Sequence, residues 1–445
     1  MINRKFYFGE LIIKKFFLNL AGYDIDKAIC EIDAIKVLSK DEFWLNQKQK
    51  RAEIFQYHFN KTKWYKKFVG NQSSSSWFDI PVITKKDLQN FSAKIDLKKN
   101  NFGRYLANTS GSSGTPFYFI KNKYCHSIAW ANIIHSYLEL GLNLSSMEAR
   151  FFGHIKNGIL SKYFYLYRDK LLRRYTFNVF SHSDQVFFDY LKKFKTKKFE
   201  YIYGYSSTIY EFSKFLIRKD IVLYDLCPSL RCCILTAEMS SQDERGIINE
   251  ALGVTVYNEY GASEVSIIAI ENKKHDWLLA TNRLWIEILN EDNLPVKEGE
   301  EGKIVITDLY NTMFPFVRYQ IGDVGSMKSI NRYPFLKLKS LSGRISDIIR
   351  LPSGRTAPGL TFYYISRSIL EKSNSIKEFK IIQKELDSFL FQIVASKEIS
   401  NSDKKKIILE TENYLEPGLK IAFHICNTIE KKYSEKTQHF FSELN

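Results

Sequence analysis

The chain has 445 residues, of which 44% are hydrophobic and 15% aromatic, and its formal net charge is +16. This much apolar surface excludes an intrinsically disordered protein, because burying it offsets the chain entropy lost on folding. With only 21 Gly and 9 Pro residues the chain is neither linker-rich nor fibrous, and its length favours about three domains, or one large domain and a small one.

The basic residues are scattered in short runs such as Lys98-Lys99 and Lys404-Lys405-Lys406. This pattern is typical of a solvated surface, so we expect no nucleic-acid partner, although a basic nucleic-acid-binding or membrane-surface protein remains an alternative interpretation of the charge. The six cysteines have no regular spacing, which predicts neither a disulfide framework nor a zinc ribbon and favours a cytoplasmic protein with reduced thiols.

The N-terminal apolar run is interrupted by Glu10, Lys14 and Lys15, so it does not resemble a signal peptide. No apolar stretch reaches the 18 residues of a spanning helix. The run predicts an amphipathic basic helix that packs on its own domain, with weak membrane-surface association as the alternative.

In chain order, the first 75 residues predict a helical region, followed by an extended entry at 79–82 into a helix capped by Thr84. From about 104 to 340, short apolar strands alternate with helical segments, which indicates an α/β layered domain. The residues after Gly343 form a pattern of the size of a small α+β domain. Within these regions we expect helices at 128–140, 208–217 and 403–415, and strands at 198–203, 229–236, 302–307, 378–383 and 389–395.

The sharpest local motif follows the short run Arg104-Tyr105-Leu106-Ala107. It reads Thr109-Ser110-Gly111-Ser112-Ser113-Gly114-Thr115-Pro116. Its glycines let backbone amides turn inward and its hydroxyls add donors, so it can cradle phosphate oxygens. It is neither a Walker loop nor a Gly-x-Ser-x-Gly elbow, and taken alone it is more typical of a flexible Ser/Gly loop.

Four further blocks follow in order and are individually unspecific. They read Ala237-Glu238, Tyr260-Gly261-Ala262-Ser263-Glu264, Arg318-Tyr319-Gln320-Ile321-Gly322-Asp323 and Gly343-Arg344-Ile345-Ser346-Asp347. Together with the Ser/Gly motif they resemble the AMP-forming adenylating superfamily of acyl-CoA synthetases and adenylation domains, from about residue 80 to the C-terminus. Residues 80–88, Gly204-Tyr205-Ser206-Ser207 and Asn258-Glu259-Tyr260-Gly261 resemble the phenylacetate-CoA ligase-like branch, which includes relatives encoded in capsular-polysaccharide loci.

The resemblance implies a large layered ATP-binding domain, residues 1–342, and a small mobile α+β domain, residues 343–445. It also implies roles for parts of the site. The loop 109–115 would hold the β- and γ-phosphates of ATP. Glu264 would hold Mg²⁺, Tyr260 would face adenine, Asp323 would bind the ribose hydroxyls and Arg344 would bridge ribose and phosphate. Residues Ala237, Glu238, Gly261, Ala262 and Ser263 complete the predicted nucleotide site, and Tyr203, Gly204, Tyr205 and Ser206 are candidates for the acyl pocket.

The C-terminal predictions depart from the family pattern at two positions. Ser346 precedes Asp347 where relatives carry two acidic residues at the hinge, and Glu435 replaces a usual glycine before Lys436. Lys436 matches the lysine that the family directs at the carboxylate and α-phosphate. Each residue also has a purely structural alternative. Glu264 would be a helix-cap carboxylate, Asp323 a turn residue and Lys436 a solvated lysine of the tail.

The resemblance therefore implies an Mg²⁺- and ATP-dependent enzyme that activates a small carboxylic acid as its adenylate and releases pyrophosphate. The acyl group would pass to a thiol or amine acceptor, either coenzyme A or, in surface-polysaccharide biosynthesis, an amine. The alternative from another class is a nucleotide-binding member of the fold without turnover, suggested by Ser346 and Glu435. The segment 270–275 lacks the cysteines of the zinc cluster found in many members of the branch, so we expect no zinc.

Overall fold

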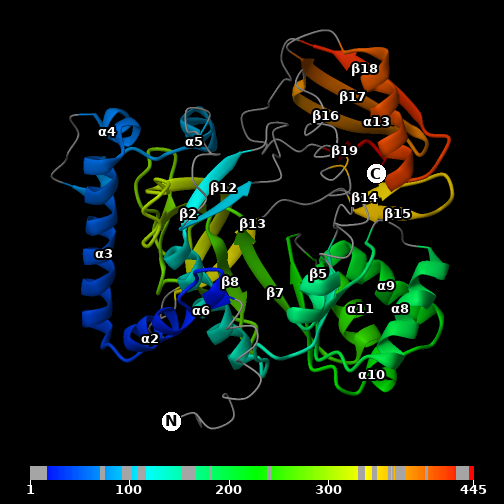
Figure 1. Ribbon diagram of the computed structural model, residues 1–445, viewed down its shortest axis with the longest axis horizontal. Helices are drawn as coiled ribbons and strands as arrows, with labels where there is room; N and C mark the ends of the chain where they lie inside the picture. The colour runs from blue at the N-terminus through cyan, green and yellow to red at the C-terminus, as the bar shows by residue number, and fades with distance from the viewer. Residues whose placement is uncertain are drawn as a thin grey trace. The chain divides into compact units, whose positions relative to one another are not determined.

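The structure is a computed structural model that describes residues 18–70, 76–92, 103–108, 117–152, 166–179, 183–237, 240, 242–328, 336–342, 348–358, 362, 365, 376–395, 399–426 and 440–444. The chain divides into two compact units (Figure 1). The first consists of residues 1–108, 118–145 and 257–343, and the second of residues 109–117, 146–256 and 344–445. The expected boundary at residue 343 between a large body and a mobile cap stays a prediction.

The first unit begins with a group of helices that pack together. Their packing joins α2, α3 and α6 through buried apolar residues that include Ile32, Ile54 and Ile128. The capping box of Ser39 and Glu42 starts α3, because each side chain accepts a backbone N–H of the other residue. The helices are α2 (Ile25–Lys36), α3 (Lys40–Lys61), α4 (Lys63–Val69), α5 (Lys85–Ser92) and α6 (Lys123–Glu139), with a 3-10 turn η2 (Trp77–Asp79).

The strands of the first unit form a hairpin and a larger sheet. The hairpin pairs β1 (Arg104–Asn108) with β2 (Tyr118–Asn122), antiparallel from Arg104 opposite Asn122 to Asn108 opposite Tyr118. The sheet has the order β10-β11-β12-β13-β9-β8-β7 and is antiparallel between the neighbours whose register is described. Its strands are β7 (Thr255–Ala262), β8 (Ser266–Glu271), β9 (Trp277–Leu279), β10 (Leu284–Leu289), β11 (Gly302–Asp308), β12 (Tyr319–Lys328) and β13 (Lys337–Ser342).

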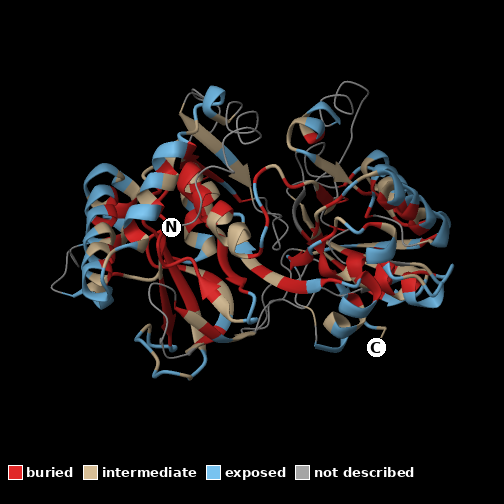
Figure 2. Ribbon diagram, turned by 90° about the horizontal axis from the view of Figure 1, so that it is seen from below, coloured by how far each residue is buried: buried red, intermediate tan, exposed pale blue. Residues whose placement is uncertain are grey.

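The second unit contains a parallel sheet of order β6-β5-β3-β4. Its helices enclose an aromatic core in which Phe177, Phe194 and Phe212 are fully buried. Buried residues follow the strands and the inner helix faces, as the red segments of Figure 2 show. The elements are β3 (Glu148–Phe151), β4 (Arg174–Thr176), α8 (Asp184–Thr196), β5 (Tyr201–Tyr205), α9 (Ser206–Arg218), α10 (Leu223–Leu226), β6 (Cys232–Thr236) and α11 (Gln242–Leu252).

The C-terminal part of the second unit has a core of its own, which includes Phe362, Phe389 and Phe440. Four of its strands form a sheet of order β18-β17-β16-β19, and β14 pairs with β15 in a separate hairpin. A side-chain cap by Ser400 starts α13, as its oxygen accepts the N–H of Asp403. The elements are β14 (Ile348–Arg350), β15 (Thr356–Pro358), β16 (Ile376–Glu385), β17 (Ser388–Ala395), α13 (Asn401–Tyr414), β18 (Lys420–Ile425) and β19 (Phe440–Ser442).

The mixed α/β class and the separate C-terminal α+β domain are confirmed. The helix capped by Thr84 is present, since Thr84 and Asp87 exchange side-chain to backbone hydrogen bonds. Two strands begin later than the sequence predicts. The strand expected from 198 begins at Tyr201, because a turn ends at the fully buried Phe199, and the strand expected from 229 begins after a turn in which Leu230 N–H donates to the Cys227 carbonyl.

Candidate active site

The block Tyr260-Gly261-Ala262-Ser263-Glu264 forms the end of β7 and the tight turn into β8. The two strands approach so closely that a Cβ on Gly261 would lie 2.9 Å from the carbonyl oxygen of Ser266. Ser266 itself has φ = 60°, a left-handed conformation that is costly for a residue other than glycine. The turn is therefore a strained structure that its surroundings must hold.

Glu264 lies in this turn and is 7% exposed. Its Oε1 accepts the hydroxyl of Tyr319 at 3.0 Å, and Tyr319 is fully buried at the start of β12. Its Oε2 accepts no hydrogen bond from any residue that the structure describes. One oxygen is thus fixed and the other is available to a ligand. Sequence reasoning assigned no role to Tyr319, although it lies inside one of the five blocks.

Tyr260 and Asp323 are brought together although 63 residues separate them. The Tyr260 hydroxyl donates to Asp323 Oδ2 at 2.7 Å, and both side chains are half-buried. β7 and β12 are not adjacent in the sheet order, so the hydrogen bond depends on the tertiary arrangement. The bond orients the phenol ring from its hydroxyl end and leaves the ring faces outside the interaction.

Arg318 opens the same block as Tyr319 and Asp323, but its guanidinium braces the fold. It is fully buried, with Nη1 donating to the carbonyls of Phe78 (3.0 Å) and Ile80 (2.5 Å). Its Nη2 donates to the Asn293 carbonyl at 3.1 Å and lies 3.5 Å from Glu287 Oε1. Arg318 therefore ties the segment before α5 to the sheet.

The acyl-pocket candidates lie in the second unit, at the carboxyl ends of parallel strands. Tyr203, Gly204 and Tyr205 end β5, and Ser206 begins α9. In α/β sheets with parallel strands this edge is where ligands usually bind. A Cβ on Gly204 would lie 2.3 Å from the Phe151 carbonyl oxygen, so only glycine fits there.

Arg150 of β3 and Phe152, directly after β3, lie at the same edge of the sheet, although the sequence did not indicate them. The Phe152 ring stacks on Tyr203 with centroids 5.3 Å apart, and it contacts Tyr205 at 4.4 Å. The Arg150 guanidinium lies 4.5 Å from the Phe152 ring centre, and its Nη1 pairs with Glu148 at 2.6 Å. Their signal in the sequence is weak, because an Arg and a Phe near a strand end are common in any α/β protein.

Ala237 directly follows β6 at the same edge, since Tyr205 pairs with Thr236 in the register. Its φ of 69° is unusual for a residue that is not glycine. Backbone strain of this kind often accompanies a functional site. The structure thus places Ala237 beside the acyl-pocket candidates of its own unit.

Several predicted site residues lie outside the described residues. They are Thr109, Ser110, Gly111, Ser112, Ser113, Gly114, Thr115, Glu238, Arg344, Ser346, Asp347 and Lys436. Residues 6–17 of the expected N-terminal amphipathic helix are outside them as well, whereas its last residue, Leu20, is helical and exposed. What the structure does define is the hairpin β1–β2, whose strands flank residues 109–117 in the chain.

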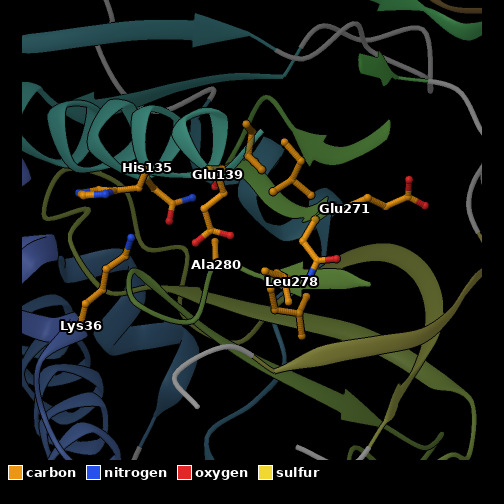
Figure 3. A pocket seen from close by; sticks show the side chains of 12 residues that line it. Lys36, His135, Glu139, Glu271, Leu278 and Ala280 are labelled. Atoms are coloured by element: carbon orange, nitrogen blue, oxygen red, sulfur yellow. The ribbon is translucent and has the colours of Figure 1, made fainter. Parts of the chain in front are cut away.

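A pocket in the first unit lies between α2, α6 and the strands β8 and β9 (Figure 3). Lys36 of α2 and His135 and Glu139 of α6 face β8 and β9 across it. Burial lowers the pKa of Lys36, and it lowers the pKa of His135 to about 4. The pocket contains none of the predicted site residues. Among the described residues no helix is long and apolar enough to cross a membrane.

Known proteins resemble the chain at the level of sequence. Residues 360–443 match the family described as the CapK C-terminal domain. The chain is 24% identical to the protein CapK of Staphylococcus aureus over 399 residues, which cover 85% of this chain and 84% of that protein. It is also 29% identical over 126 residues to phenylacetate-coenzyme A ligase of Escherichia coli, covering 27% of this chain and 29% of the ligase.

Among solved structures, the chain resembles 2-hydroxyisobutyryl-CoA ligase in complex with 2-HIB-AMP and CoA. The TM-score is 0.61 at 18% identity, and the match covers 92% of each chain. The fold is therefore that of the AMP-forming CoA ligases. The expected resemblance to the adenylating superfamily and to its phenylacetate-CoA ligase-like branch with capsule-locus relatives is confirmed.

Proposed function

We propose that this chain is an ATP-dependent, AMP-forming ligase that activates a carboxylic acid and transfers its acyl group to a thiol or an amine. Two hydrogen bonds carry the proposal, on a fold shared with a CoA ligase: Tyr260 donates to Asp323, and Tyr319, in the same block as Asp323, anchors the carboxylate of Glu264. A site for ATP needs an aromatic face for adenine, a carboxylate for the ribose and a carboxylate for the metal.

The reaction consists of two half-reactions. In the first, a carboxylate oxygen of the acid attacks the α-phosphorus of ATP, and the bond to the β-phosphate oxygen breaks to give acyl-AMP and pyrophosphate. In the second, a thiol or amine attacks the acyl carbonyl, AMP leaves with the electron pair of the broken bond, and the nucleophile gives up one proton to solvent. The first step concentrates negative charge, so positioned donors and cations lower its barrier.

Residues 109–115 would hold the leaving phosphates, Tyr260 would stack on adenine and Asp323 would accept the ribose hydroxyls. Asp323 fits this role because a half-buried carboxylate offers only acceptor oxygens, which suit the hydroxyls of a diol, and the Tyr260 hydroxyl orients it. Residues 237–238 and 261–263 complete the nucleotide site in this proposal, and Tyr203 to Ser206 line the acyl pocket.

Glu264 would hold Mg²⁺. One of its carboxylate oxygens is anchored by Tyr319 and the other accepts no hydrogen bond from a described residue, which suits a ligand of Mg²⁺. Because Mg²⁺ usually keeps several waters and binds through one or two carboxylates and the substrate phosphates, a single glutamate is enough. When bound, the ion would offset the charge of the pyrophosphate leaving group.

The C-terminal domain would act as a mobile cap that turns about the segment of Ser346 and Asp347. Arg344 would bridge ribose and phosphate, and Lys436 would reach the carboxylate and the α-phosphate while the adenylate forms. The similarity to CapK over most of the chain supports a role in surface-polysaccharide biosynthesis, and the acceptor would be coenzyme A or an amine. We place the reaction in the cytoplasm.

The proposal is tested by ATP–pyrophosphate exchange with a panel of aryl, fatty, amino and hydroxy acids, followed by acceptor trials with coenzyme A and amino sugars. We expect pyrophosphate and AMP as products, dependent on Mg²⁺. Formation of ADP and orthophosphate would refute it. Nucleotide binding without exchange for any acid would favour the binding protein without turnover.

Glu264→Gln tests the metal ligand. It should lower exchange by a factor of about 30 to 1,000, corresponding to about 2 to 4 kcal/mol of transition-state stabilisation. The matched control is Glu259→Gln, because Glu259 is also buried and also accepts a tyrosine hydroxyl, that of Tyr137, at 3.0 Å. Equal losses in both variants would remove Glu264 from the metal site.

Lys436→Ala tests the cap. It should lower exchange by about a hundredfold or more while transfer from pre-formed acyl-AMP stays near wild type. Lys432→Ala is the control and should change neither half-reaction. If Lys436→Ala leaves exchange intact, another lysine performs the step or the chain does not adenylate an acid.

A further inference from the structure

Two buried cations bind the backbone of the turn that carries Glu264. Lys121 on β2 donates from Nζ to the Ser263 carbonyl at 3.1 Å and lies 3.3 Å from Ser266 Oγ. Arg283, directly before β10, donates from Nη1 to the carbonyls of Val265 at 2.7 Å and Ile267 at 3.1 Å. The carbonyls of 263, 265 and 267 are thus each held by a cation, and Glu264 lies between the first two.

The two side chains are among the most deeply buried charges of the first unit, each 1% exposed. Burial lowers the pKa of Lys121, because desolvation disfavours its ammonium form. Asp308, whose side chain is fully buried, lies 3.5 Å from Arg283 Nη2 and compensates part of the charge. Apolar side chains of similar volume often stabilise a core as well as buried ions do, so packing alone does not explain two cations at this place.

The turn needs such a brace. Ser266 occupies the left-handed region of backbone conformation, and its carbonyl oxygen lies 2.9 Å from where a Cβ on Gly261 would be, which leaves no room for a side chain there. A strained conformation persists only where the surrounding contacts determine it. Lys121 supplies its contacts from β2, and Arg283 supplies its contacts from the position directly before β10. Lys121 thus comes from the hairpin whose strands flank residues 109–115 in the chain.

We propose that Lys121 and Arg283 are positioning residues that hold the carbonyls of 263–267, and so fix the carboxylate of Glu264 for the nucleotide-bound metal. Lys121 links the strand that follows the predicted phosphate loop to the turn that carries the predicted metal ligand. The inference rests on the proposed function for its catalytic consequence. Its structural part, the control of the turn by the two cations, stands on the contacts themselves.

The experiment compares Lys121→Met with the matched control Lys337→Met. Lys337 is a half-buried lysine of β13 in the same unit that pairs with Asp276 at 2.7 Å and does not contact the turn. The first readout is amide hydrogen exchange of residues 263–267 without ligand. It should be on the order of tenfold faster in Lys121→Met than in wild type, and unchanged in Lys337→Met.

The second readout is the Mg²⁺ dependence of ATP–pyrophosphate exchange. In Lys121→Met the half-maximal Mg²⁺ concentration should rise and kcat should fall on the order of tenfold, while KM for the acid stays near wild type. Because Lys121 acts through Glu264, the same substitution should have little further effect in a Glu264→Gln background. A lysine that only stabilised the fold would give additive losses and an unchanged Mg²⁺ requirement.

The outcomes separate this inference from the proposed function. Unchanged amide exchange at 263–267 overturns the positioning, and faster exchange with additive losses overturns its link to Glu264. If wild type exchanges no pyrophosphate with any acid, the proposed function fails, and the binding of Mg²⁺ with a non-hydrolysable ATP analogue then replaces the second readout. Should Lys121→Met not fold, Ser266→Ala removes one acceptor of the same ammonium and should shift both readouts in the same direction by less.

Discussion

Removing the Tyr319 hydroxyl should loosen Glu264 without disturbing the core around it. The Tyr319 ring is fully buried and packs on Phe316 with centroids 5.3 Å apart, so Tyr319→Phe keeps the packing. The lost hydrogen bond, 3.0 Å to Glu264 Oε1, is made to a buried carboxylate. A hydrogen bond to a charged group contributes about 1.5 to 3 kcal/mol, so we expect the unfolding free energy to fall by about 2 kcal/mol.

Urea unfolding of Tyr319→Phe measures this loss, provided the m-value stays that of the wild type. Tyr65→Phe is the matched control, because Tyr65 is equally buried but its hydroxyl has no hydrogen-bond partner among the described residues. Its removal should cost little or stabilise the protein slightly. In pyrophosphate exchange, Tyr319→Phe should be slower by about tenfold or more and Tyr65→Phe near wild type. Equal effects of the two substitutions would refute the reasoning.

Three further changes test the fold around the site. Gly204→Ala should lower the unfolding free energy by at least about 1 to 3 kcal/mol, because its Cβ would lie 2.3 Å from the Phe151 carbonyl oxygen of β3. In the same urea assay, Gly246→Ala in α11 should raise the unfolding free energy by up to about 1 kcal/mol, because the space around Gly246 is open. Arg318→Met should cost about 3 to 5 kcal/mol, since it leaves the carboxylate of Glu287 buried without its cation, and a loss below about 1 kcal/mol would contradict that role. Burial lowers the pKa of His58 from 6.5 to about 4. Between these pH values the unfolded chain therefore binds a proton that the folded chain does not. The unfolding free energy should fall by on the order of 3 kcal/mol as the pH drops from about 6.5 to 4. His58→Gln should flatten that pH dependence, and identical slopes would contradict the assignment.

The sequence by itself determined the local structure and the family resemblance. Thr84 and Asp87 predict a helix start because their side chains satisfy backbone donors three residues apart, and the structure has that cap. The alternation of apolar strands and helices predicts the α/β class, because the spacing of apolar residues along the chain shows which face of each element is buried. The five motif blocks indicated Glu264, Tyr260 and Asp323 as candidate site residues, and the roles of these residues stay proposals.

Only the tertiary structure decided which side chains hold those residues in place. Lys121 lies 142 residues before the Ser263 carbonyl that it binds, and Tyr319 lies 55 residues after Glu264. In the sequence Lys121 is one of 65 basic residues and has the appearance of surface charge. Its burial follows from the register of the β1–β2 hairpin, in which it lies opposite Tyr105, and from the close approach of β7 and β8. Partners that are distant in the chain are set by strand pairing and burial, and a local pattern carries no record of either.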